Sequence, residues 1–258
     1  MRNGGKEKFQ LIKEKKRGKI NGKRLADSAR SAERMINMTV TFDDIRHDPS
    51  IKALIEAGNE ALGVLGFTDH GYAHAGLTAR VAGDILQTLG YDERTCELAR
   101  IAGYIHDIGN AVNRVDHAMS GALLAFDVLR GMGMDIREVT AVITAIGNHD
   151  EKTAAAVTPL SAALILADKS DVRRSRVRTS VDNRDFDIHD RVNYAAVDSS
   201  LTVEKEQGFI SLRIRIDTTI CAVMDYFEIF LNRMTLCRSA AAFLGLDFEL
   251  IINETRML

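Results

Sequence analysis

The stretch Tyr104-Ile105-His106-Asp107-Ile108-Gly109-Asn110 ends an apolar pattern of helical spacing and places a histidine next to an aspartate. An imidazole and a carboxylate are both metal ligands, so the pair can supply two ligands from adjacent residues. Adjacent helical side chains point about 100° apart, so both reach one ion only near a helix end. Gly109, directly after the pair, lets the chain turn there. The stretch therefore predicts a helix end that carries metal ligands.

Further candidate ligands flank this pair on both sides. Five of the seven histidines fall between positions 70 and 149. The candidates outside the pair are His74, His117, His149 and Asp168. All of them lie near the ends of predicted helices, and a carboxylate buried at such an end would be costly without a cation. This concentration makes a metal site the leading interpretation and a hydrolase the leading function.

Apolar residues at intervals of three and four positions predict an all-α domain over roughly residues 40–180. The expected helices run from Asp48 to Gly66, His70 to Leu89, Asp92 to Ile108, His117 through Leu129, Asp135 to Gly147, and Thr158 to Asp168. The second helix has Leu77, Val81, Ile85 and Leu89 as its apolar face, and the fourth carries Leu123, Phe126 and Leu129. Asp135 and Glu138 have the spacing of a capping box.

The pattern changes near residue 200. Leu201–Glu204 and Ile210–Ile216 alternate with a period of two, and Gln207-Gly208 between them indicates a hairpin turn. A long helix over 218–244 and a third strand over 248–252 should follow. We therefore expect a mainly α protein, a helical bundle over 41–195 with a small C-terminal α+β unit over 196–258. We expect this unit to pack over the bundle or to mediate a homodimer.

Charge is unevenly distributed along the chain. The net charge is −2, yet residues 1–34 hold 12 Lys or Arg against 4 Asp or Glu, a net of +8. We expect residues 1–40 to form a basic, disordered extension; alternatively the native start is Met35 or Met38. Because the remainder is acidic, near −10, nucleic acid is not expected as the main partner.

Cysteine usage and hydropathy indicate a cytoplasmic protein without a membrane partner. The three cysteines, Cys96, Cys221 and Cys237, have no CxxC spacing and are expected as reduced thiols. No apolar run approaches the roughly 18–20 residues that span a bilayer, and the N-terminal segment lacks the apolar part of a secretory signal.

The order His74, His106-Asp107, His117, His149 and Asp168 resembles the HD superfamily of metal-dependent phosphohydrolases, in particular the subset with two additional histidines and a two-metal centre. The flanking sequence also resembles this family, with Asp69-His70-Gly71-x-x-His74 before the pair and Ala167-Asp168-Lys169 after it. The resemblance covers about residues 68–178 and is similar to HD-type hydrolases of diadenosine tetraphosphate. The chain is less similar to the HD-GYP phosphodiesterases, whose Gly-Tyr-Pro motif it lacks. The resemblance implies an HD-type helical bundle.

The resemblance also implies a ligand assignment. One ion would be held by His74, His106, Asp107 and Asp168, and a second would share Asp107 and add His117 and His149. We expect one or two divalent ions per chain, with Fe or Mn preferred over Zn, Co, Ni or Mg, because the ligands mix imidazole and carboxylate. Such ions activate a water for attack on phosphorus.

Other residues near the motifs are candidates for catalysis and substrate binding. Besides Asp107, the candidate catalytic residues are His70, one helical turn before His74 and able to contact phosphate or act as an acid, and Lys169. The candidate substrate-binding residues are Asn110, Arg114, Arg173 and Arg174, the last two in a basic run that includes Arg176 and Arg178. Asp171 is expected either at the surface, which we prefer, or behind a metal ligand.

The sequence thus predicts a phosphohydrolase that cleaves a phosphoester or phosphoanhydride bond of a small phosphorylated molecule, most plausibly a nucleotide. Two alternatives stay open. A di-iron HD site can also carry out oxidation, because hydrolytic and oxidative members share ligands. The fold can also serve as a non-catalytic nucleotide sensor or binding module, although the complete ligand set argues against this.

Overall fold

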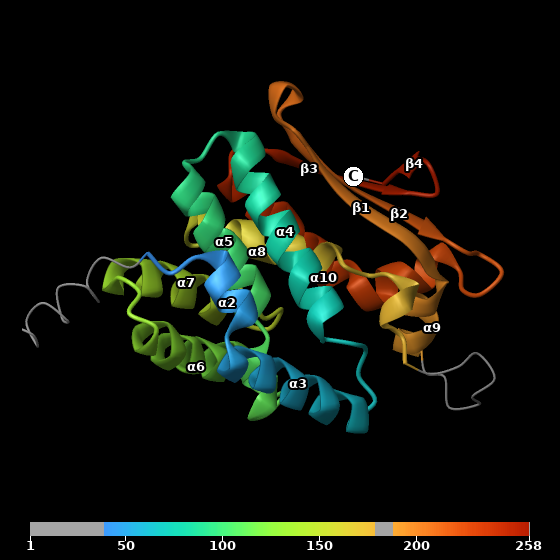
Figure 1. Ribbon diagram of the computed structural model, residues 1–258. Helices are drawn as coiled ribbons and strands as arrows, with labels where there is room; N and C mark the ends of the chain where they lie inside the picture. Colours follow the sequence, from blue (N-terminus) through green and yellow to red (C-terminus); the bar gives the residue numbers. More distant parts are fainter. Residues whose placement is uncertain (1–38, 179–187, 258) are drawn as a thin grey trace, which may run out of the picture.

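The computed structural model describes residues 39–178 and 188–257, so the expected basic extension lies almost wholly outside the described residues. The elements are α2 (Phe42–His47), α3 (Pro49–Val64), α4 (Tyr72–Leu89), α5 (Glu93–Ile105), η1 (Ile108–Ala111), α6 (His117–Gly131), α7 (Ile136–Gly147), α8 (Pro159–Ser170), η2 (Arg174–Arg176), α9 (Ile188–Ala195), β1 (Ala196–Glu204), η3 (Lys205–Gln207), β2 (Phe209–Ile216), α10 (Val223–Phe243), β3 (Asp247–Ile252) and β4 (Thr255–Arg256). The fold is mainly helical with a small C-terminal sheet, as predicted (Figure 1).

Local signals fix several helix starts. Asp48 accepts hydrogen bonds from the amides of Ser50 and Ile51 at the start of α3, and Thr158 forms a capping box at the start of α8. The predicted box at α7 is incomplete. Asp135 does cap the helix, but both carboxylate oxygens of Glu138 accept hydrogen bonds from Arg94, 2.6 and 2.7 Å away.

Small residues decide which helix faces are buried, and the predicted faces are partly wrong. On α4 the buried positions include Ala75, Ala79 and Ala82, whereas Leu77 and Val81 are half-buried. A Cβ on Gly103 of α5 would lie 2.8 Å from Ala79 Cα, so the two backbones approach too closely for larger side chains.

The predicted apolar face of α6 is also only partly right, because Leu129 alone of its three residues is buried. Leu123 is 73% exposed and Phe126 is 42% exposed. The α6 residues that face the interior include Gly121 and Ala125. A Cβ on Gly121 would lie 3.2 Å from the backbone of Gly109, and this close approach selects the small side chains.

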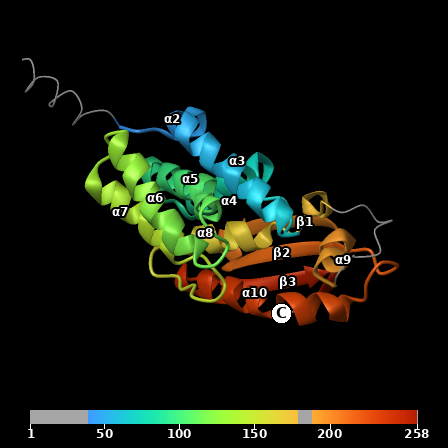
Figure 2. The same ribbon diagram turned by 90° about the horizontal axis from the view of Figure 1, so that it is seen from below.

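The C-terminal sheet has the order β1-β2-β3-β4. Strands β1 and β2 form the predicted antiparallel hairpin, with Gly208 in the left-handed region at φ 78°. Strand β3 then pairs in parallel with β2, so α10 is the crossover between them. Helix α10 packs against α8 of the bundle, as Figures 1 and 2 both show. The C-terminal unit therefore covers the bundle, while the predicted homodimer stays a prediction.

Among the described residues, no helix combines the length and the apolar character that crossing a membrane requires. The three cysteines are buried free thiols.

Candidate metal centre

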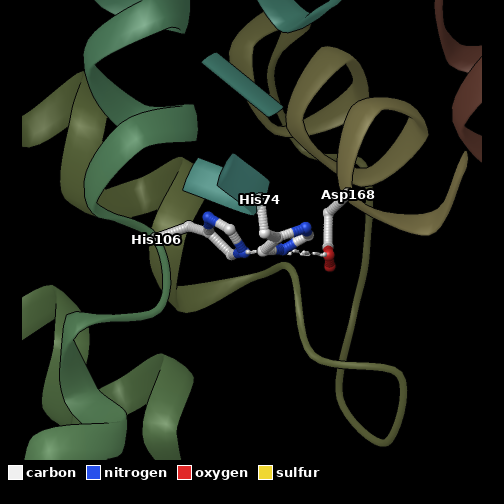
Figure 3. Close-up of side chains that lie close together, drawn as sticks. All are labelled: His74, His106 and Asp168. Carbon is white, nitrogen blue, oxygen red and sulfur yellow. Dashed lines mark hydrogen bonds and ion pairs between the residues drawn. The ribbon is translucent and has the colours of Figure 1, made fainter. Parts of the chain in front are cut away.

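The six candidate ligands meet at one point of the bundle, although they come from five helices. His74 lies in the first turn of α4, and His106 and Asp107 follow the last turn of α5. His117 is the first residue of α6, His149 follows α7, and Asp168 lies in the last turn of α8. Figure 3 shows three of them, His74, His106 and Asp168, with their side chains turned toward one another. Helix ends thus converge, as the sequence predicts.

An inner set consists of His74, His106 and Asp168. The Nε2 atom of His74 lies 3.3 Å from both His106 Nε2 and Asp168 Oδ1. One oxygen of Asp107, Oδ2, is 3.2 Å from His106 Nε2 and 3.8 Å from His74 Nε2. These four residues can therefore offer one ligand atom each to a single ion.

An outer set consists of His117 and His149. Their Nε2 atoms are 3.2 Å apart. The second oxygen of Asp107, Oδ1, lies 3.4 Å from His117 Nε2 and 3.7 Å from His149 Nε2. Asp107 thus turns one oxygen to each set, which is the arrangement of a carboxylate able to bridge two ions.

All four imidazoles of the two sets are held in the same tautomer by acceptor oxygens close to their Nδ1 atoms. The Nδ1 atoms of His106, His117 and His149 lie 2.8, 3.1 and 2.6 Å from the carbonyl oxygens of Gly103, Arg114 and Ile146. That of His74 lies 2.9 Å from Asp171 Oδ2. Because these oxygens can only accept, Nδ1 carries the proton, and the Nε2 lone pairs of neutral rings converge on Asp107 and Asp168.

This donor set fits a divalent metal ion. Neighbouring Nε2 atoms face each other at 3.2 and 3.3 Å with carboxylate oxygens among them, an arrangement that needs a proton or a metal ion between the ligand atoms. Burial raises the pKa of Asp107 and Asp168, but His106 beside Asp107, and Lys169 and His106 beside Asp168, hold both carboxyls well below their ordinary pKa. Two permanent carboxylates and four imidazoles suit transition ions better than Mg²⁺ alone.

The two sets differ electrostatically in the metal-free protein. Burial lowers the pKa of His106, but the adjacent Asp107 and Asp168 outweigh it and raise this pKa to about 10. Burial, together with His149 and Arg114, lowers the pKa of His117 to about 4. Without metal, a proton is therefore favoured on His106 and disfavoured on His117.

The structure contradicts the preferred prediction for Asp171 and agrees with the alternative, a position behind a metal ligand. Expected at the surface, it is 1% exposed and binds His74 through Oδ2, while Arg173 holds both of its oxygens at 2.6 and 3.0 Å. The signal was available, because a metal-bound imidazole needs an acceptor behind it and Asp171 lies one turn after Asp168.

A cavity of 480 Å³ opens beside the centre. Its lining includes Asp107, Asp168, His117 and His149, whereas His74 and His106 lie behind them. Five cationic side chains lie in its wall, Arg114, Lys152, Lys169, Arg176 and Arg233, beside five acidic ones, Asp107, Asp150, Glu151, Asp168 and Asp190. The apolar residues of the wall include Leu65, Phe67, Ile229 and Phe230. With metal ions balancing Asp107 and Asp168, the wall would carry more cations than acids, which would suit an anionic ligand with an apolar part.

The predicted catalytic residues His70 and Lys169 both line this cavity. Lys169 Nζ lies 2.7 Å from Asp168 Oδ2. His70 Nε2 is 4.0 Å from Asp107 Oδ2. Burial, together with Arg176 and His74, lowers the pKa of His70 well below its ordinary value. A neutral His70 whose Nδ1 faces the carbonyl of Thr68 at 2.7 Å presents a lone pair to the cavity, which disfavours the predicted role as an acid.

The predicted substrate-binding residues divide into those near the cavity and those away from it. Arg114 lines the cavity, stacks over Phe67 and places Nη1 3.2 Å from His117 Nε2. Asn110 instead holds Asp107, because its amide donates to Asp107 Oδ1 at 3.0 Å. It positions a ligand and is not part of the cavity wall among the described residues.

Arg173 and Arg174 are not brought to the cavity, contrary to expectation. Arg173 binds Asp171, and Arg174 donates to the carbonyl of Tyr194 at 2.5 Å and stacks on that ring. The basic run supplies Arg176 instead, which is 8% exposed and lines the cavity. Arg233 was missed, because only the packing of α10 on α8 brings it near the centre.

Comparisons with known proteins bear on the same region. Residues 71–192 match the model of the HD domain family. An uncharacterized protein of Methanocaldococcus jannaschii is 25% identical over 195 residues, which cover 67% of this chain and 74% of that protein. A crystal structure of a predicted HD superfamily hydrolase from an uncultured Thermotogales bacterium is 28% identical, with a TM-score of 0.37, and the match covers 50% of this chain and 71% of that one. The range 71–192 contains all six candidate ligands and Asp171, but not α10.

Proposed function

We propose that this chain is a metal-dependent hydrolase of the HD superfamily that cleaves a phosphoester or phosphoanhydride bond of a nucleotide. The match of residues 71–192 to the HD domain supports the hydrolase class. One observation carries the finer proposal. The two oxygens of Asp107 face two different imidazole sets, and this shared carboxylate lies in the wall of a cavity whose lining includes five cationic side chains.

The residues that would hold the ions follow from the distances. His74, His106, Asp168 and Asp107 Oδ2 would hold one, and His117, His149 and Asp107 Oδ1 the other. We propose Fe or Mn as the resident metals, since both accept mixed imidazole and carboxylate ligands. When bound, such a pair lowers the pKa of a water and neutralises phosphoryl oxygens.

The chain's own side chains have distinct tasks in this reaction. Arg176 and Lys169 place positive charge on the cavity wall, where they attract and orient phosphate oxygens. Asn110 and Asp171 fix the orientation of Asp107 and His74. His70, neutral at physiological pH, accepts a hydrogen bond from the substrate or from water at the edge of the centre.

The nucleotide is proposed from the shape and composition of the cavity. Its volume of 480 Å³ falls within the roughly 300–1000 Å³ of small-molecule sites. Phe67 and Phe230 offer apolar surface for a base, and cationic residues of the same wall can contact phosphate groups. Among nucleotides, the resemblance to HD-type diadenosine tetraphosphate hydrolases makes dinucleoside polyphosphates a part of the first screen.

The first test is metal content by elemental analysis of protein purified without added metal or a histidine tag, beside Asp107→Ala. We expect about two transition ions per chain, mostly lost in the variant. Mn- or Fe-loaded protein is then assayed against phosphomonoesters, phosphodiesters and nucleoside polyphosphates. Absence of bound metal even after reloading, or of turnover across the panel, would support the binding module instead.

The oxidative alternative uses the same ligands, so it is separated by oxygen. Hydrolysis should proceed equally with and without air. Product formation that requires oxygen, with no hydrolysis in the anaerobic sample, would replace the hydrolase by an oxygenase.

A further inference from the structure

Arg233 connects the C-terminal unit to the cavity. It lies on α10, outside the range that matches the HD domain, and yet it lines the cavity with Ile229 and Phe230 of the same helix. Its guanidinium stacks over the Phe230 ring at 4.5 Å. Stacking fixes the plane of the guanidinium and leaves its edge for hydrogen bonds.

The edge of this guanidinium is only partly used. Nε donates to Glu151 Oε1 at 2.8 Å. Within residues 39–178 and 188–257 that contact is the hydrogen bond the structure gives to Arg233, so both Nη groups remain for a ligand. The side chain is 21% exposed, which allows contact with a molecule in the cavity.

Glu151 stands between Arg233 and Lys169. Its Oε1 is 3.8 Å from Lys169 Nζ, and Lys169 in turn lies 2.7 Å from Asp168 Oδ2. A row of alternating charges therefore runs from the metal centre to α10, formed by Asp168, Lys169, Glu151 and Arg233. Lys169 is engaged by Asp168, a candidate ligand, so Arg233 is the outermost cation of this row and lies two charged side chains beyond the centre.

We propose that Arg233 binds a second anionic group of the substrate, a phosphate or carboxylate distinct from the phosphoryl group at the metal centre, and that Glu151 holds its place until substrate arrives. This inference rests on the proposed function, because it assigns specificity to the same cavity. The substrate class is then a phosphorylated molecule that carries at least two anionic groups.

Binding of inorganic pyrophosphate to the metal-free full chain, measured by calorimetry, tests this without any turnover. In the metal-free chain the carboxylates of the centre repel an anion. Any binding of pyrophosphate must therefore come from the cationic side chains of the cavity wall. Arg233→Gln should weaken binding by at least about tenfold, since it removes charged hydrogen bonds. Glu151→Gln should strengthen it about threefold, because a competing carboxylate is lost. Arg238→Gln, an exposed arginine on the same helix, should stay within about twofold of the parent.

The opposite signs at residues 233 and 151 separate recognition from a structural role, because loss of a stabilising ion pair would weaken binding in both variants. Arg233→Lys, which keeps the charge, should recover part of the affinity and guards against misfolding of the glutamine variant. No pyrophosphate binding by the parent, or equal binding by Arg233→Gln, would overturn the proposal.

A second arm uses the Mn-loaded chain and two substrates, an aryl phosphate with one anionic group and a nucleoside diphosphate. Arg233→Gln should raise KM for the diphosphate by a much larger factor than KM for the aryl phosphate, and it should change KM more than kcat. If neither substrate turns over, the proposed function fails while the binding arm still decides the role of Arg233. Equal losses for both substrates would contradict recognition of a second group.

Discussion

The inner and outer ligand sets contain similar side chains but have different supports. His74 in the inner set is backed by the carboxylate of Asp171, whereas both outer imidazoles are backed by backbone carbonyls. The outer set lines the cavity, and Arg114 places a guanidinium nitrogen 3.2 Å from His117 Nε2. A carboxylate that accepts a hydrogen bond from Nδ1 makes a ligand imidazole more basic, whereas a cation close to its Nε2 atom weakens the binding of a metal ion there. We therefore expect the inner set to bind its ion more tightly than the outer set.

The largest effect should come from the residue that the two sets share. Asp107→Asn removes the charge that faces both, so metal content should fall to near zero and turnover by at least about a thousandfold. Elemental analysis and initial rates measure this, with the exposed acid Asp127→Asn on α6 as the control. An ion retained at full occupancy would show that the inner set does not need Asp107.

Gly109→Ala should damage the outer set selectively. An added Cβ would overlap the carbonyl oxygen of His117 and lie 2.5 Å from Gly121 N, so α6 must shift and carry His117 with it. We expect one ion per chain instead of two and a loss of turnover of about a hundredfold. Gly76→Ala on α4, where the added Cβ meets no atom within 4 Å, should keep both ions.

Asp171→Asn should weaken the inner set alone. The neutral amide no longer supports the basicity of His74, so affinity for the tighter ion should fall about 10–100-fold, while the weaker site is unchanged. Competition with a fluorescent chelator resolves the two affinities. If the weaker site responds instead, our assignment of the tight ion to the inner set is wrong.

His106 of the inner set and His117 of the outer set should also respond to pH in opposite directions in the metal-free protein. The raised pKa of His106, about 10 against 6.5 when unfolded, gives stability that is complete below pH 6.5 and is lost as pH rises toward 10. The lowered pKa of His117, about 4, gives stability that is complete above pH 6.5 and is lost as pH falls toward 4. Denaturant titrations should therefore show that His117→Gln loses less stability than the parent between pH 6.5 and 4. Identical acid limbs would contradict this.

The smallest effect should be at Arg114. Arg114→Gln removes the cation in front of His117, so the second ion should bind about threefold more tightly, while KM for an anionic substrate rises. The same chelator competition measures the first change and steady-state kinetics the second. Weaker binding of the second ion would mean that Arg114 supports the outer set.

Much of this centre could be predicted because histidines and aspartates at helix ends are chemically specific and the ends themselves are marked locally. Asp48 and Thr158 cap their helices as expected, and Gly208 turns the predicted hairpin. The rest depends on packing between distant segments. No local sequence pattern predicts that β3 pairs in parallel with β2.

The misplaced side chains have the same origin. Asp171 becomes buried because α4 brings His74 against the segment after α8, and Arg233 enters the cavity because α10 packs on α8. Leu123 and Phe126 become exposed because glycine contacts, not large apolar side chains, set the rotation of α6. Periodicity reports which residues are apolar but not how closely two backbones approach.

The parallel pairing of β2 with β3 also has a consequence for the order in which the molecule is completed. All six candidate ligands and Asp171 precede β1 in the chain, whereas α10, which carries Arg233, follows β2 and is joined to the sheet again through β3. During synthesis from the N-terminus, the ligands therefore leave the ribosome well before the helix that carries Arg233 can be locked in place. The residues of the metal centre are therefore synthesised first, and the helix that completes the cavity is synthesised after them.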